Sequence, residues 1–162
     1  LPVPLLVGER ARAVVERVEA ELWPALGLRT LAPAYARCRG RRAGDPAARD
    51  SAYHQGTVWP WLLGAFVDAW LRTREDARSA LPEARRRFLA PLLAHLGDFG
   101  LGHVSEIADG DAPHRADGCP FQAWSVGEAL RMAQLLGASP DGGAAEAPQA
   151  PVPLAKAAGR AS

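Results

Sequence analysis

The sequence has little of several features that would indicate other classes of protein. It holds 2 cysteines among 162 residues, too few for a disulfide framework or a four-ligand zinc site. A reducing compartment, the cytoplasm, is therefore the simpler expectation. No apolar run approaches the ~18 residues of a membrane span, and the first residues show neither the basic leader nor the cleavage site of a signal peptide. We expect a soluble chain without a membrane partner.

An excess of one charge is also missing. The chain has 19 Lys and Arg against 18 Asp and Glu, so no overall field would attract nucleic acid. Basic residues cluster only in Arg37–Arg42 and Ala84–Phe88, and we interpret both clusters as solvated faces. Phosphate loops, dinucleotide fingerprints and nucleophile motifs do not occur. We therefore expect no nucleic-acid partner and no cofactor.

Apolar residues recur at helical spacing in four segments, and no segment shows the alternation of a strand. Thr57 could cap the second helix with Pro60 in its first turn, Pro91 should kink the third, and Gly137 should stop the fourth. The fourth helix should turn Leu130 inward. The fold class predicted from these patterns is all-α. The predicted helices are Glu9–Trp23, Thr57–Thr73, Pro82–Leu96 and Ala123–Leu136.

Two long polar stretches, residues 25–56 and 97–122, separate these helices. Loops of this length within a compact domain are commonly functional, and each precedes a helix headed by Trp. We expect both to be ordered and to line a common site at one end of the helices. Residues 138–162 are rich in Ala, Pro and Gly and lack large side chains, which predicts a disordered tail.

The second loop concentrates groups that can carry chemistry. HVSEIADGDAPHR holds three carboxylates, Glu106, Asp109 and Asp111, together with His103 and His114. Their spacing fits neither a calcium loop nor a zinc helix, so we expect no metal. Asp109 before glycine is good turn chemistry. Glu106 has the least evident structural role, although a solvated loop glutamate is the alternative.

Aromatic side chains gather where loop and helix meet. In a helical domain Trp is most often core, and we expect this of Trp23, Trp70 and one of Trp59 and Trp61. A flat ring beside His54 and Gln55 can instead hold the apolar face of a sugar while polar groups bond its hydroxyls. The residues alone leave both interpretations open. The junction aromatics are Tyr53, Trp59, Trp61, Phe121 and Trp124.

Two long motifs resemble a known family. RDSAYHQGTVWPWLLGAFVDAWLR and SEIADGDAPHRADGCPFQAWSVGEALR closely resemble the C-terminal part of glycogen debranching enzymes, the amylo-alpha-1,6-glucosidase domain, and GLRTLAP, RGR and GDPAARD match its intervening loop. The resemblance implies a six-hairpin glycosidase, an (α/α)6 toroid, of which residues 1–137 would form the last helical hairpins. It also implies hydrolysis of alpha-1,6-linked glucose at branch points of an alpha-glucan such as glycogen or limit dextrin.

The resemblance also implies roles for individual residues. An inverting glycosidase uses one carboxyl group to protonate the leaving oxygen and a second to activate water on the opposite ring face. The family's late acidic motif supplies the base, which corresponds here to Glu106. Asp109 and Asp111 would orient sugar hydroxyls or the loop itself. The implied wall of the glucose site consists of His54, Gln55, Trp59, Trp61 and Trp124.

Two departures from the family pattern matter. Residues 32–42, APAYARCRGRR, replace acidic residues and tyrosine of the family, so we expect no sugar contact there. A complete toroid needs over ~200 residues, and its general acid would lie upstream of residue 1. We therefore expect the chain to be inactive alone, with the missing N-terminal part of the same domain as its partner.

Three other interpretations remain open. The chain could be a non-catalytic module that binds oligosaccharide or another protein on the same helical scaffold. It could belong to a related hydrolase or phosphorylase built on the same toroid. It could also be an unstable fragment, in which case Val58–Leu71 would form an exposed apolar patch prone to association.

Overall fold

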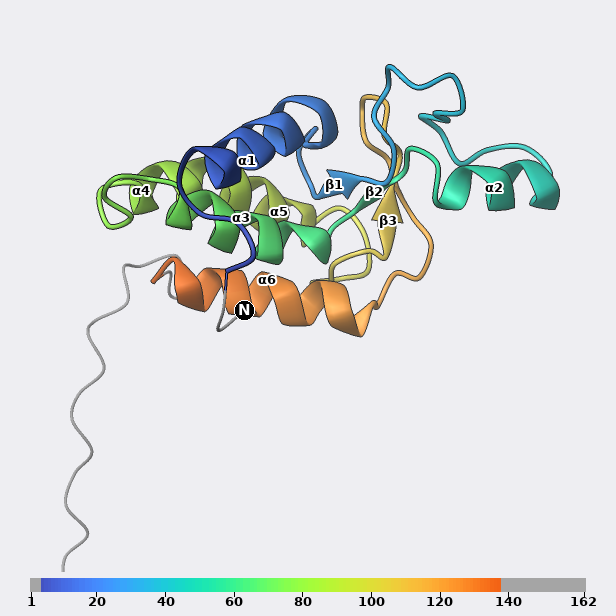
Figure 1. The fold of residues 1–162 in the computed structure, drawn as a ribbon. Coiled ribbons are helices and arrows are strands. Elements are labelled where there is room, and N and C mark those ends of the chain that lie inside the picture. The colour runs from blue at the N-terminus through green and yellow to red at the C-terminus, as the bar shows by residue number, and fades with distance from the viewer. Residues whose placement is uncertain (1–3, 138–162) are drawn as a thin grey trace, which may run out of the picture.

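The computed structural model describes residues 4–137, and the predicted tail lies outside these residues. Helices pack together in one part of the molecule, and a small sheet with long loops occupies the other (Figure 1). None of the described helices is long and apolar enough to span a membrane. The helices are α1 (Gly8–Leu22), α2 (Pro46–Tyr53), α3 (Leu62–Arg72), α4 (Leu81–Ala84), the π-helical η1 (Arg85–Leu89), α5 (Ala90–His95) and α6 (Ala123–Leu135).

Helix α3 is the centre of the hydrophobic core. It lies between α1 and α6 (Figure 1) and also contacts α4. Leu63, Val67 and Trp70 are fully buried, and Phe66 is nearly so. A helix that is apolar on almost all sides is stable only when neighbours cover every face. Most large apolar side chains of Val58–Leu71 are buried, although Ala65 is exposed. The apolar patch expected of an unstable fragment is therefore not formed by these large side chains.

The start of α3 differs from the prediction. The helix begins at Leu62, because Val58 and Trp59 form a strand instead of a first helical turn. The Thr57 hydroxyl donates a 2.6 Å hydrogen bond to the Tyr53 carbonyl and caps no helix. Pro60 precedes the helix and separates it from the strand.

The third predicted helix is present as one continuous run, α4 through η1 to α5. The expected disturbance near Pro91 takes the form of the π-helical turn η1, in which the Ala90 N–H bonds the Arg85 carbonyl five residues earlier. Proline lacks an N–H and its ring displaces the preceding carbonyl, and a wider turn accommodates this. Phe88 and Leu89 point from this turn into the core.

A four-stranded antiparallel sheet in the order β1-β2-β3-β4 corrects the all-α prediction. Its strands have two residues each, too short for alternation to be visible in the sequence. Val58 pairs with both Arg29 and Ala108, so the sheet binds the two long loops to each other. The strands are β1 (Leu28–Arg29), β2 (Val58–Trp59), β3 (Ile107–Ala108) and β4 (Ala116–Asp117). The fold is thus mostly helical with a small sheet, and the toroid stays a prediction.

The two long loops contain more structure than expected. Helix α2 lies within the first, beyond the sheet from the helical layer (Figure 1). The Asp45 carboxylate caps it by accepting the Ala48 N–H at 2.8 Å, and Pro46 occupies its first turn. Helix α6 ends as predicted, with Gly137 at φ +62°, but Leu130 is 61% exposed and was wrongly expected inside.

His95, the last residue of α5, fixes the second loop to the core. It is buried, and its Nε2 accepts the Ser105 backbone N–H at 3.3 Å and lies 3.1 Å from the Ser105 hydroxyl. Burial lowers the pKa of His95, with a smaller opposing effect from Asp98. Protonation would convert Nε2 from an acceptor into a donor and break the backbone bond.

Acidification should therefore destabilise the fold through His95. Because its folded-state pKa lies below the ordinary 6.5, the contribution is complete above that pH and is lost as pH falls through the lowered pKa. Urea midpoints at about pH 7 and pH 5 measure this, and a His95→Gln variant should lose less stability between the two. An equal loss in both proteins would contradict the assignment.

Candidate active site

Glu106 lies half-buried where the two long loops meet, immediately before β3. Three donors from three segments bind its carboxylate. The Tyr53 hydroxyl, at the end of α2, donates to Oε1. The side-chain amide of Gln122, at the start of α6, also donates to Oε1, at 3.3 Å. The Cys119 backbone N–H donates to Oε2 at 3.0 Å. The expectation that both loops contribute to one place is confirmed.

These bonds fix Glu106 without using all of its acceptor capacity. A carboxylate offers about four lone-pair positions, and the three donors leave one on Oε2. The Glu106 N–H bonds the Cys119 carbonyl at 2.9 Å, so the backbone is held as well as the side chain. A Cβ at Gly118 would lie only 2.5 Å from Oε2. Because Gly118 has no side chain, it leaves room for the Glu106 carboxylate in this position.

Tyr53 is the main partner of Glu106, although the sequence indicated only an aromatic wall. Its pKa is raised to about 12, first by desolvation, then by the hydrogen bond to Glu106 and by the negative charge of Glu106. The guanidinium of Arg42, 5.5 Å from the ring centre, acts in the opposite direction. The phenol therefore remains a proton donor to the carboxylate well above neutral pH.

The titration of Tyr53 is a direct test of this contact. In a Tyr35→Phe variant Tyr53 is the sole tyrosine, and its tyrosinate absorbance should appear with a midpoint of about 12. Adding Glu106→Ala should lower the midpoint, because the hydrogen bond and the charge are removed together. The same midpoint with and without the Glu106 carboxylate would show that the two side chains do not interact.

Four aromatic side chains continue from Tyr53 as a ledge toward α6. His54 stacks on Trp59 at 5.1 Å, Trp59 meets Trp124 edge-on at 6.1 Å, and Trp124 stacks on Trp61 at 5.5 Å. Trp59 is 4% exposed, whereas Trp124 is 48% exposed. We call His54, Trp59, Trp61 and Trp124 the aromatic ledge. Its exposed rings are suited to contact with a sugar face, and the buried Trp59 packs against His54 and Trp124.

The other predicted site residues organise the loops. The Asp109 carboxylate accepts the Arg42 backbone N–H at 2.9 Å. The Asp111 N–H bonds the Gly40 carbonyl at 2.9 Å, and its exposed carboxylate lies 3.9 Å from Arg29. The Gln55 backbone carbonyl accepts the Arg39 N–H at 2.6 Å. These contacts support the alternative role expected for Asp109 and Asp111, which is to orient the loop.

Arg42, Asp117 and Gln122 are near Glu106, and the sequence did not indicate them. Arg42 Nη1 donates to Asp117 Oδ2 at 2.9 Å, and Asp117 Oδ1 accepts the Gly118 N–H at 2.7 Å. Arg42 lies in the segment for which no role in the site was expected. The available signal was the family resemblance on both sides of that segment, which placed it between two site motifs.

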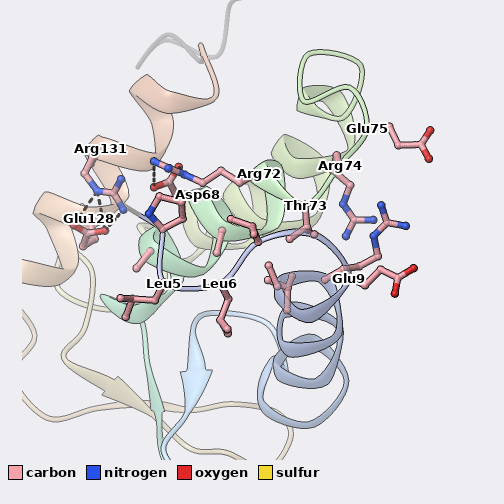
Figure 2. A pocket seen from close by; sticks show the side chains of 18 of the residues that line it. Leu5, Leu6, Glu9, Asp68, Arg72, Thr73, Arg74, Glu75, Glu128 and Arg131 are labelled. Atoms are coloured by element: carbon pink, nitrogen blue, oxygen red, sulfur yellow. Dashed lines mark hydrogen bonds and ion pairs between the residues drawn. The ribbon is translucent and has the colours of Figure 1, made fainter. Parts of the chain in front are cut away.

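One groove among the described residues lies apart from Glu106. This groove of about 900 Å³ runs between the N-terminal segment, α1, α3 and α6, and Trp61 is its only residue from the aromatic ledge. Two pairs of its charged side chains bind each other, Asp68 with Arg72 and Glu128 with Arg131 (Figure 2). The lining of the groove is mostly apolar, and Glu106 is not part of it.

Residues 4–137 contain no group of three or more His, Cys, Asp or Glu side chains arranged to hold a metal ion. His103 instead packs edge-on against Phe121 at 5.0 Å, and His114 Nδ1 lies 3.1 Å from the Asp109 carbonyl. Cys38 and Cys119 are both free thiols. The groups that bind the Glu106 carboxylate are a phenol hydroxyl, a backbone N–H and a side-chain amide.

A carboxylate beside exposed aromatic rings is suited to contact with a sugar. The sequence model of the amylo-alpha-1,6-glucosidase family matches residues 1–131, most of the chain. The chain belongs to the amylo-alpha-1,6-glucosidase family, a family of glycoside hydrolase domains. No curated protein matches the sequence.

Proposed function

We propose that this chain supplies the general base, Glu106, for inverting hydrolysis of alpha-1,6-linked glucose at branch points of an alpha-glucan such as glycogen. The observation that carries the proposal is the carboxylate bound by Tyr53, Cys119 and Gln122 with one acceptor position open. Membership of the glucosidase family supports the reaction class.

In this mechanism a water molecule occupies the open acceptor position on Oε2. Glu106 takes a proton from the water while the water oxygen attacks the anomeric carbon. The bond from that carbon to the glycosidic oxygen then breaks. A general base must lie within hydrogen-bond reach of the proton that it removes. The fixed carboxylate meets this requirement without reorganisation during the reaction.

The reaction also needs an acid that protonates the leaving oxygen, about 6.5 to 9.5 Å from the base. Of the carboxylates nearest in sequence, Asp109 accepts a backbone N–H and Asp117 bonds Arg42 and Gly118. The exposed Asp111 carboxylate lies 3.9 Å from Arg29. We assign the acid to a different segment of polypeptide that packs over the two loops. On this proposal residues 4–137 alone bind glucan but do not hydrolyse it.

The aromatic ledge accounts for recognition of the sugar. His54 packs against Tyr53 and Trp124 packs against Trp59. Both are exposed, and aromatic faces hold the apolar side of a pyranose. Gln122 and Gln55 are amide side chains that could bond hydroxyl groups, and both are partly exposed. A single glucose at the end of a branch is a ligand of suitable chemistry for this surface.

Product analysis tests the proposal. The chain should release no glucose from limit dextrin by itself, and should release it when combined with the family segment that carries the acid. Inversion at an alpha linkage gives the beta anomer, which proton NMR detects before mutarotation. Release of alpha-glucose, or hydrolysis by residues 4–137 alone, would contradict the proposed mechanism.

A non-catalytic oligosaccharide-binding module is the second candidate, and the exposure of Trp124 favours it. Both functions predict binding of maltooligosaccharides to the isolated chain, measurable by calorimetry. They differ in the presence of the acid-bearing segment, where only the catalytic function predicts turnover. Continued binding with no glucose release under that condition would favour the binding module.

A further inference from the structure

Arg42 contacts both segments that hold Glu106. Its guanidinium lies over the Tyr53 ring, and Nη1 pairs with Asp117 at 2.9 Å. Its own backbone N–H bonds Asp109 at 2.9 Å. The side chain is three-quarters buried, and its Nε has no hydrogen-bond partner within residues 4–137. These contacts place one cation between Tyr53 of the first loop and Asp109 and Asp117 of the second.

From these contacts we propose that Arg42 is the positioning residue for Glu106. It holds the two oxygens of the Glu106 carboxylate through two separate chains of contacts, which we call arms. The inference rests on the proposed function, because it assigns a role within the same site. Arg42 does not contact Glu106 itself in any recorded bond, so it acts through its neighbours and is not a catalytic residue.

The first arm passes through Tyr53. A cation near an aromatic face is attracted to the ring, which restricts the ring that donates its hydroxyl to Glu106 Oε1. The Tyr53 carbonyl is also held, since it accepts bonds from Thr57 and from the Trp59 indole. With its backbone and its ring both fixed, the hydroxyl has one direction in which to donate.

The second arm passes through Asp117. Arg42 binds Oδ2 of this residue while Oδ1 accepts the Gly118 N–H at 2.7 Å. The turn so formed presents the next N–H, that of Cys119, to Glu106 Oε2. Charge-assisted bonds are the stronger class of hydrogen bond, so the Arg42 and Asp117 pair is suited to fixing this turn.

An arginine that only tethers two loops would show the same contacts, and the two roles differ in what its loss affects. Loss of a tether loosens the loops generally, whereas loss of a positioning residue affects Glu106 specifically. Methionine retains much of the apolar stem of Arg42 and removes its charge and donors. Arg41 is its exposed neighbour with no recorded side-chain bond, so Arg41→Met is the matched control.

The amide exchange of Cys119 tests the arms without requiring catalysis. Its N–H bonds the Glu106 carboxylate, and Glu106→Ala calibrates the loss of that bond. In Arg42→Met we expect exchange at Cys119 to rise about tenfold, as for loss of one hydrogen bond, while Arg41→Met leaves it unchanged. Unchanged exchange in Arg42→Met overturns the proposal. An equal rise at the core amides of α3 also overturns it, because that result indicates general destabilisation.

Kinetics in the presence of the acid-bearing segment provide the second readout. Misplacement of a reacting group by about 1 Å can cost about 10²-fold in rate, so Arg42→Met should lower kcat by roughly that factor with little change in KM. A raised KM at unchanged kcat would overturn the positioning role. If the unsubstituted protein releases no glucose, the proposed function fails, while the exchange experiment still decides whether Arg42 holds Glu106.

Discussion

Replacement of Glu106 by Gln should lower the hydrolysis of alpha-1,6-linked glucose by about 10²- to 10⁴-fold, the usual contribution of a general base. The amide has nearly the same shape, and its oxygen can still accept the Tyr53 hydroxyl or the Cys119 N–H. It cannot take a proton from water. We therefore expect the loss in kcat, with KM and folding stability little changed.

Asp111→Asn is the matched control for this experiment. It removes a carboxylate from the same loop, but that carboxylate is half exposed and 3.9 Å from its nearest cation, Arg29. We expect less than about a tenfold change in rate, because surface ion pairs of this kind contribute little. Full activity in Glu106→Gln, or an equal loss in Asp111→Asn, would refute the assignment of the base.

The sequence predicted the core helices because their signal is local. Apolar residues at helical spacing and the stop signals of proline and glycine located α1, the α4 to α5 run and α6 to within a residue or two. The same periodicity predicted a helix that starts too early, at Thr57, because pairing of Val58 with Ala108 outweighs helix formation there. Strands of two residues depend on their partners, and sequence periodicity does not reveal such partners.

The candidate site was predictable only in part, for a related reason. The family motifs indicated Glu106 and the aromatic ledge, whose members lie within those motifs. Tyr53 and Glu106 are 53 positions apart, and Arg42 and Asp117 are 75 apart. Such contacts exist only after the sheet has joined the loops. Gly118, which leaves space for the Glu106 carboxylate, is likewise explained only by the folded geometry.

Replacement of Trp70 by Ala should destabilise the fold by about 3 to 5 kcal/mol, the usual cost of deleting a buried aromatic side chain. Trp70 is fully buried, its ring lies 5.3 Å from that of Phe88, and its indole donates to Glu19 at 2.9 Å. Domains of this size have a total stability of about 5 to 15 kcal/mol. The urea midpoint should therefore fall sharply, or the variant should fail to fold.

Trp124→Ala should have the opposite profile, because this ring is 48% exposed and forms part of the aromatic ledge. We expect a stability change below about 1 kcal/mol, since partly exposed positions away from the core tolerate truncation. Maltooligosaccharide binding should weaken by about tenfold, since a factor of ten corresponds to 1.4 kcal/mol and an aromatic contact is worth about that much. Calorimetry and urea titration on both variants separate the two roles. Loss of stability without loss of binding in Trp124→Ala would show that the ring serves the core and not a sugar.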